Sequence, residues 1–198
     1  MEKLSKLTTN NPLKLNDFNF SGFSRSKNWI GYFERINSYS FELVDEAIEM
    51  FDTFFKNEQD NVLVMTALNY DELDESYDKD EVMKKYRPIH NKFRLMGILQ
   101  EFNKDFENYV FEDAKLSANC LRFDFLKWSD IIELSELMMS YSCSMREACF
   151  FIFINLNLAV YPHGDTGFGC IGLNDKKENG IKFLEYCKKN KNFKIAIE

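Results

Sequence analysis

Residues 150–173 read FFIFINLNLAVYPHGDTGFGCIGL, and this stretch decides the fold. Its first five residues form a continuous apolar run, whose aromatic and β-branched content favours a buried strand over a short helix. The Asn-Leu-Asn that follows predicts a tight turn, because asparagine tolerates positive φ angles and bonds its own backbone. Residues 158–161 return as a second strand. That strand ends, or reaches a sheet edge, at Pro162, because proline donates no backbone hydrogen bond.

The next turn, from His163 to Gly169, has two interpretations. Four of the chain's 8 glycines fall at positions 164, 167, 169 and 172. In the functional interpretation, exposed N–H groups at Gly164 and Gly167 lie beside His163 and Asp165 and form a site. In the structural interpretation, a β-turn leads into a bulged strand over residues 168–173. The composition favours the structural interpretation, because turns of this kind are ordinary.

Patterns elsewhere predict the remaining elements. Residues 40–55 carry apolar side chains at helical spacing, with Ser40 as the N-cap, and residues 62–68 form a strand. We further expect a helical segment at 29–36, a helix at 81–86 that stops before Pro88, and strands at 13–20, 93–100, 109–112, 121–125 and 193–197. The other expected helices are one capped by Ser129 that runs to Met139, a turn with capping-box spacing at 144–147, and one at 175–190.

These elements predict one α+β domain over residues 1–198, with a mostly antiparallel sheet and helices packed on one face. The length suits one sizeable core, and the 20 phenylalanines and 45% hydrophobic content are typical of a globular chain. We expect about the first 10 residues to be mobile.

Composition limits the function classes. The net charge of −7 makes a nucleic-acid binder an unfavoured class, because the average surface repels phosphate. The N-terminus lacks the apolar segment of a signal peptide, and no run reaches the length of a membrane span, so we expect a cytoplasmic protein without membrane contact. The 5 cysteines form no CxxC pair and indicate reduced, buried thiols. Only two histidines are present, so we expect no metal site. The phenylalanine-, asparagine- and lysine-rich usage is typical of a bacterial genome of low GC content.

The main charged run covers residues 71–81. It fails the pattern of a calcium loop, because the sixth and twelfth positions counted from Asp74 are lysines. Two interpretations stay open, a solvated loop and an acidic surface for a basic partner. If it is a binding surface, the residues that carry it are Tyr70, Asp71, Glu72, Asp74, Glu75, Tyr77 and Asp78, with the tyrosines as anchors.

Catalytic patterns are scarce. Asp165 could orient the imidazole of His163, which makes these two residues the weak catalytic candidates. No nucleophile elbow, phosphate-binding loop or dinucleotide fingerprint occurs. We therefore expect a protein without a cofactor that binds a partner and is not an enzyme.

The turn and the helix after it resemble a family of small uncharacterised bacterial cytoplasmic proteins. In that family a C-terminal hairpin ends in a Tyr-Asp-Asp-Arg-Gly turn, followed by a strand and a terminal helix with an aromatic-rich tail. The matching place here is residues 161–167, in which Tyr161, Asp165 and a glycine remain and the Asp-Arg pair is missing. The helix before residues 62–68 also fits that layout. Members of the family look like interaction proteins, and small acidic bacterial proteins of this kind often serve as immunity proteins to secreted toxins.

The first functional hypothesis is therefore an acidic protein that binds a basic partner, namely an immunity protein that neutralises a bacterial toxin domain. The alternative is a small enzyme or ligand-binding protein that uses the 163–169 turn. A third possibility is a regulatory subunit whose apolar surface is buried in an oligomer. The sequence leaves the oligomeric state open.

Overall fold

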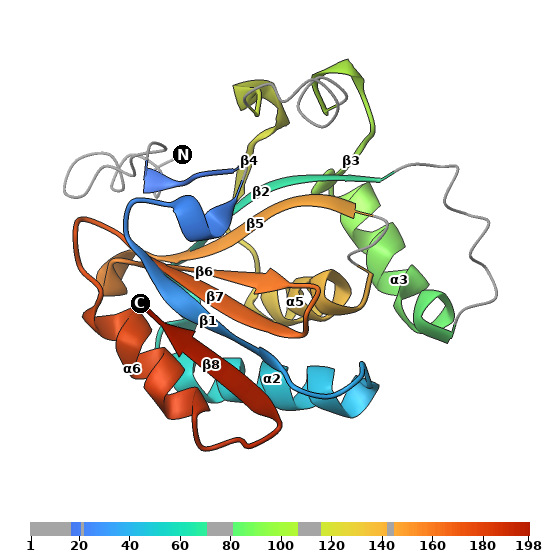
Figure 1. Cartoon of the computed structure of the whole chain (residues 1–198). Coiled ribbons are helices and arrows are strands. Elements are labelled where there is room, and N and C mark those ends of the chain that lie inside the picture. Colours follow the sequence, from blue (N-terminus) through green and yellow to red (C-terminus); the bar gives the residue numbers. More distant parts are fainter. Residues whose placement is uncertain (1–16, 21, 71–80, 107–115, 142–144) are drawn as a thin grey trace.

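The computed structural model describes residues 17–20, 22–70, 81–106, 116–141 and 145–198, and it has an α+β fold (Figure 1). Eight strands form one sheet in the order β3-β2-β5-β6-β7-β1-β8, with β4 also beside β2. The strands are β1 (Trp29–Arg35), β2 (Val62–Tyr70), β3 (Leu99–Glu101), β4 (Arg122–Asp124), β5 (Met145–Phe153), β6 (Leu158–His163), β7 (Gly167–Gly172) and β8 (Phe193–Ile197).

The sheet is mostly antiparallel, because β2 with β3 is the one parallel pair among the described strands. Its centre is the stretch that the sequence singles out. β5 pairs with β2 along its whole length and turns into β6 through Asn157, whose φ of 51° is left-handed. The strand does not end at Pro162, because β6 continues to His163. Pro162 pairs with Phe168 of β7, and the pairing of β6 with β5 stops at Val160, so no ladder bond to β5 is lost at the proline.

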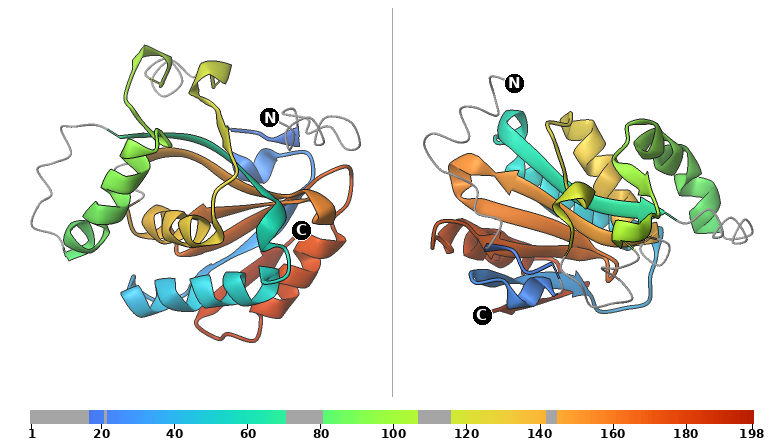
Figure 2. Two further views of the ribbon diagram at one scale, coloured as in Figure 1. Left: turned by 180° about the vertical axis from the view of Figure 1, so that it is seen from behind. Right: turned by 90° about the horizontal axis from the view of Figure 1, so that it is seen from above.

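Among the described residues, four long helices cover one face of the sheet, as predicted (Figures 1 and 2). They are α2 (Phe41–Phe55), α3 (Glu81–Leu95), α5 (Trp128–Tyr141) and α6 (Glu178–Cys187). Helix α2 begins where expected, because the Ser40 hydroxyl accepts a hydrogen bond of 3.3 Å from the Leu43 amide. Its apolar side packs aromatic rings against the sheet, with Phe55 stacked on Phe153 at a centroid distance of 4.1 Å.

The opposite face has a second, smaller core. Phe18 from an irregular segment, Phe106 from a short helical stretch and Cys120 from a 3-10 turn share this core with Phe150 and Tyr161 of the sheet. Figure 2 shows those segments crossing the face that the four helices leave free. Cores on both faces account for the large number of phenylalanines. They also bury Cys120, Cys149, Cys170 and Cys187 as free thiols, as the sequence predicts.

The prediction of a helical segment at 29–36 is wrong, because residues 29–35 form β1. A β-bulge explains the error. The register with β7 shifts between Trp29 and Gly31, so Ile30 and Phe33 both face the helices although three positions separate them. That spacing imitates a helix. Gly31 accommodates the bulge with a φ of +146°.

Several predicted boundaries are also wrong. Helix α3 continues through Pro88 to Leu95, so residues 93–95 are helical and the strand expected at 93–100 shortens to β3. Helix α5 begins at Trp128, so Ser129 lies inside its first turn instead of capping it. Glu147 belongs to β5 and not to a helical turn. The strand expected at 109–112 lies outside the described residues, as does the first half of the strand expected at 13–20. The described half, residues 17–20, forms no strand, so that part of the prediction is wrong.

None of the helices in the described part of the chain combines the length and the apolar character that a membrane crossing requires.

Candidate functional site

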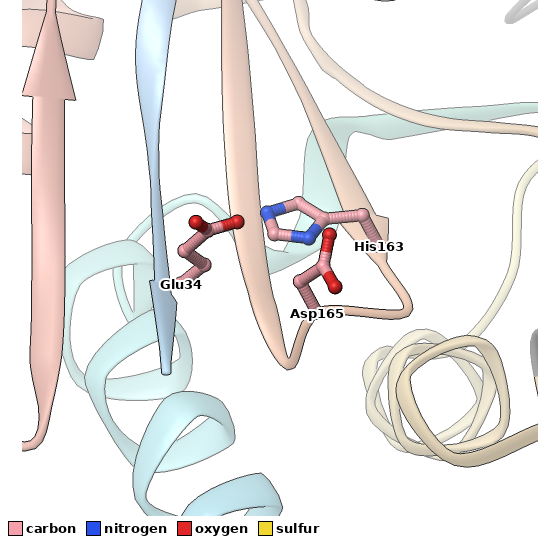
Figure 3. A group of neighbouring side chains, drawn as sticks. All are labelled: Glu34, His163 and Asp165. Atoms are coloured by element: carbon pink, nitrogen blue, oxygen red, sulfur yellow. The ribbon is translucent and has the colours of Figure 1, made fainter. Parts of the chain in front are cut away.

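The sheet brings His163 and Asp165 together with Glu34, a residue that the sequence did not single out (Figure 3). His163 ends β6, Asp165 lies in the β6–β7 turn, and Glu34 comes from β1. One donor atom from each side chain lies within 4.8 Å of the other two. In Figure 3 the imidazole lies between the two carboxylates.

Gly167 allows this arrangement. It pairs with His163 on one side and with Glu34 on the other, so the three residues form one row across β6, β7 and β1. Residues paired across a sheet point to the same face, and the two outer strands are about 10 Å apart. With no side chain between them, His163 and Glu34 can reach toward each other over β7. A Cβ at Gly167 would lie 1.9 Å from the Phe33 carbonyl oxygen.

The neighbouring row repeats the pattern. Gly169 pairs with Tyr161 and with Tyr32, and the Tyr161 ring lies across the glycine, where a Cβ would come within 2.1 Å of it. The Trp29 indole donates a 2.9 Å hydrogen bond to the Tyr161 hydroxyl, and burial raises the pKa of Tyr161 to about 12. Alternate glycines therefore leave a strip of β7 without side chains, and aromatic rings border it. These two glycines serve close packing, which agrees with the structural interpretation of the glycine cluster.

The pKa of His163, in the row with Gly167 and Glu34, shifts in an unusual direction for a histidine beside two acids. Burial lowers the pKa of His163, although the carboxylates of Asp165 and Glu34 and the Phe33 backbone act in the opposite direction. The imidazole is therefore neutral at pH 7. Its Nε2 atom is buried and makes no well-aligned hydrogen bond with the described residues. A neutral imidazole with an unused ring nitrogen can accept a proton or bind a cation.

Two cations accompany the carboxylates. The Lys194 ammonium lies 2.5 Å from Glu34 Oε1, and this contact raises the pKa of Lys194. The Arg35 guanidinium donates 3.1 Å hydrogen bonds to the Gly164 carbonyl and the Thr166 hydroxyl, which ties the turn to β1. The arrangement can therefore hold a charged ligand, while the hydroxyl of Thr166 is engaged with Arg35 and is not poised as a nucleophile.

A second feature is an acidic groove between α2 and α5, with a volume of 530 Å³. Carboxylates from both helices surround three apolar side chains. The lining residues are Asp45, Ile48, Glu49 and Asp52 of α2, and Trp128, Ser129, Ile132 and Glu133 of α5. The Trp128 indole donates a 2.6 Å hydrogen bond to Asp52, and its ring stacks on Phe51 at 5.3 Å between centroids. Those contacts hold the indole in place at the groove wall.

Most of the binding surface expected from the sequence lies outside the described residues, namely Asp71, Glu72, Asp74, Glu75, Tyr77 and Asp78. Tyr70 ends β2 and is half-buried. The Arg94 side chain covers its ring at 4.1 Å, and His90 meets it edge-on at 5.7 Å. One face of Tyr70 is therefore already occupied within the chain.

No family model, curated protein or solved structure matches this chain. The resemblance to the Tyr-Asp-Asp-Arg-Gly family therefore stays a prediction.

Proposed function

We propose that this protein is an acidic binding module that captures a basic protein partner in the groove between α2 and α5. We further propose that this partner is a bacterial toxin domain, which would make the chain an immunity protein. The observation that carries the proposal is the row of carboxylates along α2, in which Asp52 accepts a hydrogen bond from Trp128 while Asp45 and Glu49 form no ion pair with a described side chain.

Helix α2 holds five acidic residues and no basic one. Four of them, Glu42, Asp45, Glu49 and Asp52, follow one another at spacings of three or four residues and therefore share one side of the helix. Like charges at these spacings destabilise a helix by about 0.2–0.5 kcal/mol per pair. A partner with basic side chains would relieve that repulsion, so the row is better explained by binding than by folding.

The two walls of the groove differ in whether their carboxylates form ion pairs. On the α5 wall, Lys92 lies 2.6 Å from Asp130 and 2.5 Å from Glu133, so one ammonium offsets two carboxylates. On the α2 wall, no described side chain forms an ion pair with Asp45 or Glu49. The unpaired charge therefore lies on α2, beside the fixed indole of Trp128. Aromatic anchors ringed by charge are typical of protein interfaces.

Toxin domains of the nuclease type have cationic clefts, which a carboxylate-lined groove would match in sign. The net charge of −7 would also speed encounter with such a partner. The acidic run at 71–81 would add to the same field wherever it lies, because long-range steering depends on summed charge.

The test uses basic toxin domains encoded beside the gene for this chain, with binding kinetics measured by surface plasmon resonance. The double variant Asp45→Lys with Glu49→Lys should slow association by about tenfold or more. The control, Glu101→Lys with Glu178→Lys, changes net charge equally at exposed positions away from the groove and should leave most of the rate intact. Equal losses in both variants, or none in either, would contradict a role for the groove.

A second candidate is a ligand-binding or catalytic role for the 163–169 turn. The juxtaposition of Glu34, His163 and Asp165 supports it. Replacing His163 and Asp165 with alanine should abolish that role while the chain stays folded, which circular dichroism would check.

A further inference from the structure

We propose that Glu34, His163 and Asp165 bind a divalent transition-metal ion on the face of the sheet that the helices leave free. The proposal names the ligand of the second candidate function and does not depend on the partner-binding groove. The three side chains supply one nitrogen and two carboxylate donors, a set that zinc and other first-row transition metals accept. Three protein donors leave a fourth position open to water or a further ligand.

The donor atoms are already close to the required spacing. Metal–nitrogen and metal–oxygen distances near 2.0–2.2 Å place two donors no more than about 4.4 Å apart. The three atoms here lie within 4.8 Å of one another, so a small rotation closes the set. Asp165 is exposed on the turn, and its side chain is free to make that rotation.

The buried nitrogen of His163 points to a missing partner. Nε2 is inaccessible to solvent and makes no well-aligned hydrogen bond with the described residues, although the Phe33 backbone also favours the protonated ring. An unsatisfied buried polar atom costs about 1–3 kcal/mol, so native proteins seldom keep one without a reason. A cation held between the imidazole and the carboxylates would satisfy that nitrogen.

The backbone around the donors is held in a fixed shape. Thr166 has a left-handed φ of 56°, which is unfavourable for a β-branched residue, and it is fully buried. The turn has three residues, and its third position usually holds glycine for this reason. Arg35 fastens the turn through Gly164 and Thr166, and Gly167 allows the close approach of β1. Such strain is typical of functional sites.

Lys194 acts as the counter-ion of the metal-free site. Its ammonium contacts Glu34, and its pKa is raised by that residue first and by Asp165 more weakly. It extends from the edge strand β8 and is exposed, so it can swing away when a dication enters. If Lys194 competes with the metal, replacing it should strengthen metal binding. Replacing a lysine that only forms a structural ion pair should not.

The test is calorimetric titration of the whole chain with Zn²⁺. Lys194→Gln should bind Zn²⁺ about tenfold more tightly than the wild type, because a nearby positive charge is gone. His163→Asn and Asp165→Asn should each weaken binding by about tenfold or more. Titration with Co²⁺ should give absorption without a thiolate charge-transfer band, which separates this site from the cysteines.

Matched controls exist on the same chain. Lys27→Gln and Asp175→Asn remove the members of another surface ion pair, whose atoms are 3.0 Å apart, and should leave Zn²⁺ affinity unchanged. The groove variant Asp45→Lys with Glu49→Lys should also bind Zn²⁺ normally, so failure of one proposal is distinguishable from failure of the other. The metal proposal is overturned if neither the wild type nor Lys194→Gln binds Zn²⁺, or if Asp165→Asn binds it as well as the wild type.

Discussion

At the scale of single residues, two glycines and one histidine shape the free face of the sheet. Gly167 and Gly169 remove side chains from alternate positions of β7, which lets the side chains of β1 and β6 meet above it. His163 then lies between carboxylates with a neutral ring. The glycines can be recognised in the sequence as a G-x-G pair. The sequence does not indicate that Glu34 is the residue that approaches His163 across them. Glu34 lies on a strand about 130 residues earlier, and no local pattern reports which distant strand will pair.

Gly167→Ala should destabilise the protein by about 3 kcal/mol. The added Cβ would lie 1.9 Å from the Phe33 carbonyl oxygen, so β1 and β7 must separate. Chemical denaturation measures the change. Gly22→Ala is the control, because its Cβ would meet the flexible Arg25 side chain at 3.5 Å or more and should cost little. Equal stability of the two variants would show that the strands do not approach so closely.

Glu136 on α5 gives a pH-dependent prediction. Burial raises its pKa, and the charge of Lys85 acts in the opposite direction without cancelling the shift. The native state therefore holds a proton that the unfolded chain releases, so unfolding becomes easier as the pH rises from about 4.3 through the raised pKa. Glu136→Gln removes this loss and should be more stable than the wild type near pH 7.

The advantage of Glu136→Gln should shrink as the pH falls below about 4.3, where the carboxyl becomes protonated in the unfolded state as well as the folded one. Thermal unfolding of both proteins across this range provides the measurement. A constant difference between the two melting temperatures would mean that Glu136 is not desolvated in the folded chain.

At the scale of elements, local signals were reliable and non-local ones were not. The hairpin of β5 and β6, the α2 helix with its cap and the final strand β8 were predicted because turn chemistry, capping and periodicity act between near neighbours. β1 was missed because its bulge gives Ile30 and Phe33 a helical spacing. Helix α3 was cut short at Pro88, although packing against α5 and β3 outweighs the lost hydrogen bond.

Serine capping distinguishes the two helices directly. Ser40→Ala should destabilise the protein by about 1 kcal/mol, since the hydroxyl satisfies the Leu43 amide at the start of α2. Ser129→Ala should change stability by less than about 0.5 kcal/mol, because that residue lies exposed within the first turn of α5. Urea denaturation of the two variants provides the comparison. A larger loss for Ser129→Ala would restore the boundary expected from sequence.

At the scale of the whole molecule, the α+β class and the one-sided helix layer followed from the sequence, and the surfaces did not. The acidic row of α2 comes to lie beside Trp128 only because α5 packs against α2. Binding surfaces combine side chains from separate elements, so composition can predict the sign of the charge but not where it gathers. The charged run at 71–81 was the more obvious sequence signal, and its structure lies outside the described residues.

The two tryptophans of the chain make the groove directly testable. Trp128 lies in the groove, whereas Trp29 donates a hydrogen bond to Tyr161 on the face of the sheet that the helices leave free. Each indole N–H gives a separate NMR signal, so a ¹⁵N-labelled sample can be titrated with an arginine-rich peptide as the basic probe. We expect the Trp128 indole and the amides of Asp45 and Glu49 to shift, with the Trp29 indole unmoved and the shifts lost on Asp45→Lys with Glu49→Lys. Shifts scattered over the whole surface, or centred on Trp29, would contradict the proposed binding groove.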